Sequence, residues 1–221
     1  MAVAHNMSNV LALREIRPVV LAPMAGVTDA PFRAAVRGYG AALVYSEMVA
    51  SAELLRDRRS AALRLKADRR HGPIAIQLAG RDPHALAEAA RMAEAEGAIL
   101  IDINMGCPAK KVVGGLCGSA LMREPELASA LVRAVVGAVS LPVTVKMRLG
   151  WDDGDRNAPK LARRLEGDGA QAFSIHARTR AQFYEGRADW RFIRQVKDAV
   201  SVPVLANGDV VSPRDAVEIL N

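Results

Sequence analysis

Short apolar segments alternate along the chain with longer segments that have helical periodicity. Helix start signals lie between the apolar segments: Asp82 and Ser212 each precede a proline, and Asp189 precedes a periodic segment. This order predicts an α/β fold with parallel strands. The predicted strands are residues 19–22, 42–46, 74–78, 99–104, 143–148, 173–176 and 204–207.

The residues that lead into these strands also alternate. The odd-numbered strands follow Pro18, Pro73, Pro142 and Pro203, and the even-numbered ones follow the Gly-Ala pairs 40–41, 97–98 and 169–170. A two-unit repeat is typical of a (β/α)8 TIM barrel, whose interior layers are filled by alternate strands. An open doubly wound sheet is the alternative, but no G-x-G-x-x-G follows the first strand. Seven of eight βα units are present, so we expect an incomplete barrel.

Side chains that could bind a ligand or take part in catalysis lie at or just past the C-terminal end of each predicted strand. The strand ends form the catalytic face of a TIM barrel. Because every strand contributes, we interpret them as a functional site rather than as scattered surface residues. They are Met24, Glu47, Gln77, Asn104, Lys146, Arg148, His176 and Asn207.

Cys107 follows the fourth strand in a loop between Gly106 and Pro108. Pro108 fixes its own φ and disfavours helical geometry at Cys107, while Gly106 permits another molecule to approach the backbone. Asn104 and two lysines are close in sequence. A thiol held at a strand end in polar surroundings favours a reactive group. The alternative is a buried structural cysteine.

The composition fits one soluble globular domain over residues 1–221, with 51% hydrophobic and 24% charged residues. Two cysteines give no disulfide framework, and we find neither a signal-peptide pattern nor an apolar stretch that could span a bilayer. We therefore expect a cytoplasmic protein. The net charge of +6 favours a polyanionic partner. Much of it lies in residues 55–71, for which a solvated helix face is the other interpretation.

Six motifs occur in order along the chain, and together they are specific. From about residue 16 onward the chain resembles the tRNA-dihydrouridine synthases, most closely the bacterial B-type. The motifs are LAPMAGVTD at 21–29 with PFR at 31–33, QLAG at 77–80, DINMGCP at 102–108, KMRLGW at 146–151, HARTR at 176–180 and ANGD at 206–209.

The resemblance implies an FMN-binding TIM barrel, without a metal, that uses NADPH to reduce the 5,6 double bond of specific uridines in tRNA to dihydrouridine. It implies that Cys107 protonates C5, a role that suits a thiol largely protonated at neutral pH. Lys146 would lie near the N1/O2 edge of the flavin. The other implied cofactor contacts are Pro23, Met24, Ala25, Gln77, His176, Asn207, Gly208 and Asp209, and the implied substrate contacts are Asn104, Arg148, Arg178 and Tyr184.

In the family that the chain resembles, the seventh strand is followed by an eighth strand, a Gly-Arg pair that binds the FMN phosphate and a helical domain that binds tRNA. This chain ends on the helix after the seventh strand. We therefore expect a monomer that binds FMN weakly and tRNA poorly, or one that depends on a partner. Two alternatives stay open: a flavin barrel that acts on a free pyrimidine, like dihydroorotate dehydrogenase, and an inactive truncated product.

Overall fold

The computed structural model describes residues 19–57 and 74–220. The chain divides into two compact units, which we describe separately. Unit 1 is Met1–Ile103 with Ala130–Thr144, and unit 2 is Asn104–Ser129 with Val145–Asn221. The chain passes between them within β5 (Leu100–Met105), α7 (Pro125–Val136) and β6 (Val143–Arg148). The single domain expected from the sequence stays a prediction.

Unit 1 is built on parallel strands. β1 (Val20–Leu21), β2 (Leu43–Tyr45), β4 (Ile74–Ala79) and the first part of β5 lie side by side in that order. A two-residue strand, β3 (Val49–Ala50), pairs with the end of β4. All six residues of β4 are buried, as expected for a parallel strand covered on both faces.

Three helices follow strands of unit 1: α2 (Ala30–Gly38), α3 (Ser51–Arg56) and α5 (Pro83–Ala95). The carboxylate of Asp82 accepts a hydrogen bond from the backbone N–H of Ala85, so the predicted cap begins α5. Asp29 begins α2 in the same way, through the N–H of Phe32.

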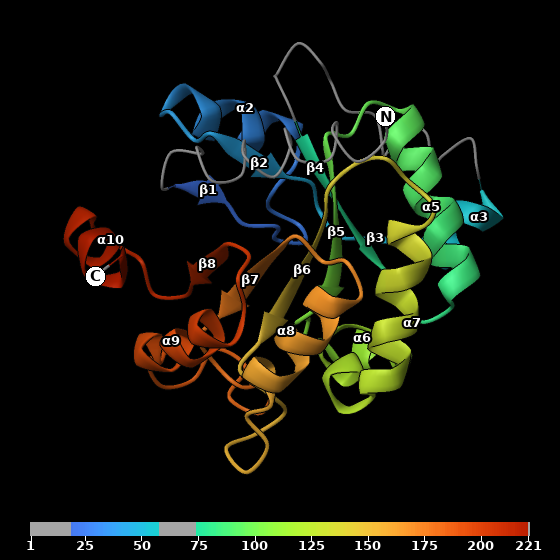
Figure 1. The fold of residues 1–221 in the computed structure, drawn as a ribbon. Coiled ribbons are helices and arrows are strands. Elements are labelled where there is room, and N and C mark those ends of the chain that lie inside the picture. The colour runs from blue at the N-terminus through green and yellow to red at the C-terminus, as the bar shows by residue number, and fades with distance from the viewer. Residues whose placement is uncertain (1–18, 58–73, 221) are drawn as a thin grey trace. The chain divides into compact units, whose positions relative to one another are not determined.

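Unit 2 contains α6 (Lys110–Gly114), the 3-10 helix η2 (Gly118–Arg123), α8 (Ala158–Gly167), β7 (Ala172–His176), α9 (Trp190–Ala199), β8 (Val204–Asn207) and α10 (Pro213–Leu220). The strands β6, β7 and β8 are neighbours in that order, and α8 packs against α9 (Figure 1). His176 lies opposite Asn207 at the ends of β7 and β8. Consequently the side chains after these strands emerge at the same level.

The Gly-Ala pairs before β2, β5 and β7 are helix C-caps. Gly40, Gly97 and Gly169 have φ values of 95°, 95° and 104°. In each pair the N–H groups bond back to the last helical turn, as Ala98 does to Ala93 and Gly97 to Glu94. This is the Schellman arrangement, in which glycine takes the left-handed position. The Gly-Ala repeat in the sequence therefore arises because the preceding helices all end in the same C-cap.

The predicted α/β class and the parallel strands of an incomplete TIM barrel are confirmed. All seven predicted strands are present, with ends within one residue of their expected places. The two-residue strand β3 was not predicted. Most of the basic segment 55–71 lies outside the described residues. No helix in the described part of the chain is both long and apolar enough to span a membrane.

Candidate active site

The backbone of the Cys107 loop is held from two sides within unit 2. The side-chain oxygen of Asn104 accepts hydrogen bonds from the N–H groups of Gly106 and Cys107, at 3.3 and 3.0 Å. The carbonyl of Cys107 accepts from the N–H and the hydroxyl of Ser119, at 3.1 and 3.0 Å. Cys107 itself is partly exposed. These bonds fix the loop backbone at a residue that is not fully buried.

Gly118 makes this close approach possible. Its φ of 60° is left-handed, and a Cβ placed on it would lie 2.7 Å from the carbonyl oxygen of Cys107. Both observations call for glycine, because other residues rarely adopt this conformation and none has room for its side chain. Gly118 and Ser119 therefore support the candidate catalytic loop.

Arg148 lies at the end of β6 and is 1% exposed. Its Nε donates to the carbonyl of Gly106 at 3.0 Å, and its Nη1 donates to the carbonyls of Thr179 and Phe183 at 2.8 and 2.7 Å. No carboxylate of the described residues forms an ion pair with it. Burial is the main cause that lowers the pKa of Arg148, while the nearby Cys107 and Tyr184 act in the opposite direction.

Lys146 and Asn207 bring together side chains from β6 and β8. The Lys146 ammonium donates to the amide oxygen of Asn207 at 3.2 Å. These strands are the two neighbours of β7, and alternate strands of such a fold place side chains in a common layer. Two residues predicted to contact the cofactor are therefore in direct contact.

His176, at the end of β7, is 9% exposed and is held neutral by its surroundings. Burial lowers its pKa to about 3, with further lowering from Arg148, Lys146 and Arg178. Arg178 Nη1 lies 3.4 Å from His176 Nε2. Because a guanidinium can only donate, Nε2 is the acceptor and the ring proton sits on Nδ1.

Arg178 forms a two-pronged ion pair with Asp209. The guanidinium reaches one carboxylate oxygen through Nη1 at 2.8 Å and the other through Nη2 at 2.9 Å. Asp209 also accepts from the N–H of Ala188 at 2.7 Å, and these bonds hold its pKa below the ordinary value. In the preceding residue, Gly208, a Cβ would lie 2.9 Å from His176 Cδ2. The backbone after β8 thus passes directly against the imidazole.

Tyr184 borders the same cluster from the outside. It is 72% exposed, its ring centroid lies 6.1 Å from that of His176, and the Arg148 guanidinium carbon lies 5.5 Å from the ring centroid. An exposed aromatic ring beside buried polar groups can stack on a planar ligand. All the site residues predicted for unit 2 are therefore in or beside one cluster.

Within unit 1, the predicted site residues lie in two places. Residues 23–25 form the loop after β1, in which the N–H of Thr28 donates to the Met24 carbonyl at 3.0 Å and the Glu47 carboxylate accepts from the N–H of Gly26 at 2.5 Å. Gln77 is 1% exposed within β4.

The Gln77 amide belongs to a buried network. Its Nε2 donates to Asp102 at 2.6 Å, and the other oxygen of Asp102 accepts from the Thr144 hydroxyl at 2.6 Å. The Gln77 amide group is therefore oriented by a carboxylate, with its nitrogen toward Asp102. The roles of Gln77 and residues 23–25 toward a cofactor stay predictions.

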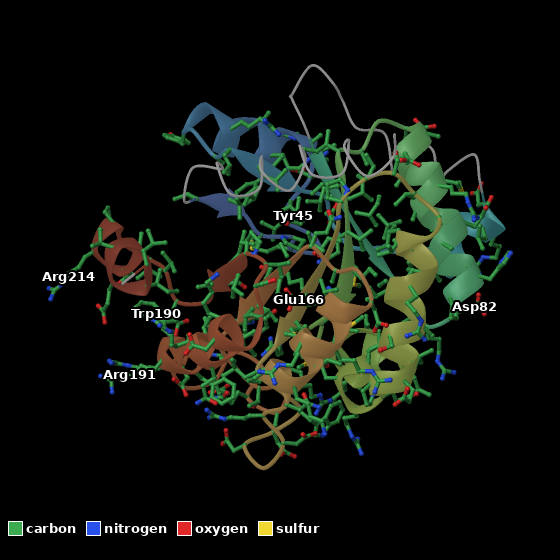
Figure 2. The ribbon with its side chains drawn as sticks, viewed as in Figure 1. Tyr45, Asp82, Glu166, Trp190, Arg191 and Arg214 are labelled. Carbon is green, nitrogen blue, oxygen red and sulfur yellow. The ribbon has the colours of Figure 1, made fainter. Side chains whose placement is uncertain are left out.

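Several residues that shape the cluster were missed by the sequence analysis. Ser119 holds the Cys107 loop, Phe183 takes a left-handed φ of 51° and offers its carbonyl to Arg148, and the Trp190 indole donates to the Gly208 carbonyl at 2.8 Å. Figure 2 shows Trp190 at the start of α9, next to the solvent-directed Arg191. The Gly-Ser pair at 118–119 was the available signal for the first of these, since it marks a turn near the cysteine loop.

The cluster is suited to an anionic, hydroxyl-bearing cofactor. It combines a lysine, a neutral histidine with one N–H donor and a glycine where a side chain would fill the space beside that histidine. These groups suit a phosphate, ribityl hydroxyls and the edge of a flavin ring. Within the described part of the chain, no three His, Cys, Asp or Glu side chains gather as metal ligands.

The family model for dihydrouridine synthase (Dus) matches residues 20–221. The chain belongs to the dihydrouridine synthase family. It is 59% identical over 202 residues to a protein of Rhizobium leguminosarum bv. phaseoli named "Probable tRNA-dihydrouridine synthase", covering 91% of this chain and 63% of that protein. A Rhodobacter capsulatus protein of the same name is 55% identical, with 95% and 65% covered.

The B-type resemblance is confirmed by tRNA-dihydrouridine synthase B of Pseudomonas aeruginosa, which is 50% identical over 202 residues, 91% of this chain and 61% of that protein. The chain thus spans less than two thirds of the length of these dihydrouridine synthase relatives.

Solved structures with low identity share the fold. Histamine dehydrogenase from Rhizobium sp. 4-9 matches with a TM-score of 0.70 at 13% identity, over 92% of this chain and 42% of that one. A 2,3-dimethylmalate lyase matches with a TM-score of 0.60 at 14% identity, over 97% and 78%. At these identities the likeness shows the fold alone.

Proposed function

We propose that the chain carries the catalytic site of an FMN-dependent reductase that converts specific uridines of tRNA to 5,6-dihydrouridine. We propose tRNA as its substrate and the cytoplasm as its location. Relatives named tRNA-dihydrouridine synthase support this reaction class. The observation that carries the proposal is the Cys107 loop, whose backbone is fixed by Asn104 and Ser119 beside a buried arginine without a carboxylate partner among the described residues.

Lys146, His176, Asn207 and Gly208 of unit 2 would hold the cofactor. When bound, FMN reduced by NADPH supplies the hydride for C6 of the uracil ring. Lys146 would provide a positive charge near the flavin edge that becomes negative on reduction. The Nδ1–H of His176 and the backbone at Gly208 suit oxygen acceptors of the ribityl chain or phosphate.

Cys107 would act as the general acid. Hydride addition at C6 leaves negative charge on C5 and the C4 carbonyl oxygen of the base. The thiol proton moves to C5, and the resulting thiolate is reprotonated from solvent. A rigid loop is useful for this step, because proton transfer requires the donor to be held within hydrogen-bond reach of the carbon.

Arg148 would stabilise the charge that develops on the base. Its guanidinium is buried and donates to three backbone carbonyls, of Gly106, Thr179 and Phe183. A preorganised cation in a site of low polarity interacts strongly with a developing oxyanion. Asn104 and the exposed ring of Tyr184 complete the proposed uracil contacts, by hydrogen bonding and stacking.

The test combines the flavin spectrum of the purified protein with reduction of unmodified tRNA by NADPH. We expect flavin bands with added FMN, turnover on tRNA and none on free uridine or orotate. Cys107→Ala should lower turnover by about 100-fold or more. Cys117→Ala is the matched control, since that thiol donates to the Gly115 carbonyl within its own turn.

Three results would contradict parts of the proposal. A protein that stays colourless with added FMN would refute the cofactor, and full turnover of Cys107→Ala would refute the general acid. Preferential reduction of a free pyrimidine would replace tRNA as the substrate.

A further inference from the structure

Arg178 connects three segments of unit 2 through a side chain that is only 6% exposed. Its Nε donates to the carbonyl of Glu185 at 3.1 Å, and its Nη2 donates to that of Gly186 at 2.9 Å. The remaining directions of the fork reach both oxygens of Asp209 and the ring of His176. Each guanidinium nitrogen thus has a partner within the protein, so the side chain is committed to internal contacts.

The contact with His176 selects one form of the imidazole. A guanidinium carries five N–H donors and no acceptor, so His176 Nε2 must present its lone pair to Arg178 Nη1. The single ring proton is therefore on Nδ1. A protonated imidazolium would place two donors against each other at this contact, which the geometry disfavours.

The contact with Asp209 stabilises an unusual backbone. Asp209 has a φ of 56°, in the left-handed region that costs a residue with a side chain free energy. The paired bonds from Arg178 and the N–H of Ala188 hold its carboxylate in place. A Cβ placed on Gly208, one residue earlier, would lie 2.9 Å from Cδ2 of His176. The turn after β8 and the histidine are therefore fixed by the same arginine.

We propose that Arg178 is a positioning residue that fixes the Nδ1-protonated form of His176 and the left-handed turn at Asp209, so that His176 offers one N–H donor to an oxygen of the cofactor. This assignment rests on the proposed function of the cluster. It gives Arg178 a different role from the substrate contact implied by the family resemblance.

The charges around His176 agree with this role. Lys146 and Arg148 face it from β6, Arg178 from the segment after β7 and Asp209 from the segment after β8, while the Tyr184 ring lies 6.1 Å away. Burial and the three cations lower the pKa of His176, and Asp209 raises it. Removing Arg178 and removing the charge of Asp209 should therefore have opposite effects on the imidazole.

The test is ¹⁵N-histidine NMR of the protein without added FMN, with the His176 signals assigned through His176→Gln. In the wild type we expect a neutral ring with an unprotonated Nε2. Arg178→Met should give a mixture of the two neutral forms and a higher titration midpoint, whereas Asp209→Asn should keep the Nδ1-protonated form with no rise in midpoint. Arg164→Met is the matched control, because Arg164 pairs with Glu126 and Ser129 away from the cluster.

Arg178→Lys separates charge from geometry. It keeps one positive charge but lacks the fork, so we expect a low midpoint together with a mixture of ring forms. An Arg178→Met protein that folds like the wild type and keeps the wild-type His176 form would overturn the proposal.

Affinity for FMN gives a second readout. Arg178→Met and Arg178→Lys should bind FMN about tenfold more weakly than the wild type. Wild-type affinity in both variants would overturn the link to the cofactor. If the wild type binds no FMN, the proposed function loses its cofactor, but the NMR result still decides whether Arg178 governs His176.

Discussion

Arg148 and Arg178 are two buried arginines at the ends of neighbouring strands, and both donate to backbone carbonyls. The two guanidinium groups differ in the partners that surround their charge. Arg178 has a carboxylate partner in Asp209, whereas Arg148 has three carbonyls and no ion pair with a described carboxylate. One positive charge is therefore neutralised within the protein, and the other is only solvated by dipoles.

This difference distinguishes a structural cation from a functional one. Burying an uncompensated charge is costly, so proteins usually pair it. Arg148 is the more completely buried of the two and still lacks a counter-charge in the described structure. A site that must stabilise a transient negative charge needs such a cation, because a resident carboxylate would cancel its field. We therefore assign Arg148 to the reaction and Arg178 to the architecture around it.

The largest expected effect separates these two roles. Arg148→Met should lower turnover on tRNA by about 100-fold with little change in FMN affinity, because it removes charge stabilisation during the reaction. Arg178→Met should instead weaken FMN binding. Turnover and FMN titration of both variants, with circular dichroism as a check on folding, would measure this. If both arginine variants lose the same property to the same extent, the distinction is wrong.

A second comparison uses two glycines near the Cys107 loop. Gly118→Ala should destabilise the protein by about 2–3 kcal/mol, since the left-handed φ and the contact with the Cys107 carbonyl both exclude a side chain. Gly114→Ala is the control, because a Cβ there meets nothing within 4 Å and Gly114 lies in α6. Urea unfolding of both variants would measure the free energies. Equal unfolding free energies of the two variants would show that the loop accommodates a side chain at position 118 without loss of stability.

The sequence predicted the strands and the level at which their ends meet, because both depend on local patterns. Apolar runs and caps such as Asp82 are readable without tertiary contacts. Lys146, His176 and Asn207 lie close together because they stand at the same level of the three neighbouring strands β6, β7 and β8. This part of the site follows from strand periodicity.

The roles of the polar residues could not be read in the same way. Arg178 and Arg148 look alike in the sequence, and only the position of Asp209 distinguishes them. Gln77 stands at a strand end, but its amide bonds to Asp102, a residue 25 positions away. The side chain that supplies or removes a charge is set by long-range packing, which a single sequence does not display.

The smallest expected effect concerns the neutral histidine. The pKa of His176 is about 3 in the folded protein, compared with about 6.5 for a free imidazole. Between these values the unfolded chain binds a proton that the folded protein does not, so stability is full above about pH 6.5 and falls as the pH is lowered. At pH 5 the loss amounts to roughly 2 kcal/mol.

Unfolding free energies at pH 7 and pH 5 would measure this loss, and His176→Gln should remove most of it, whereas the control His84→Gln, at an exposed position of α5, should retain it. Asp209 does not interfere in this window, because its pKa is lowered from 3.8 and its contribution is lost only at more acidic pH. An equal pH dependence in wild type and His176→Gln would mean that burial and the nearby cations Arg148, Lys146 and Arg178 do not keep the imidazole neutral. The contrast between the two arginines would then rest on geometry alone.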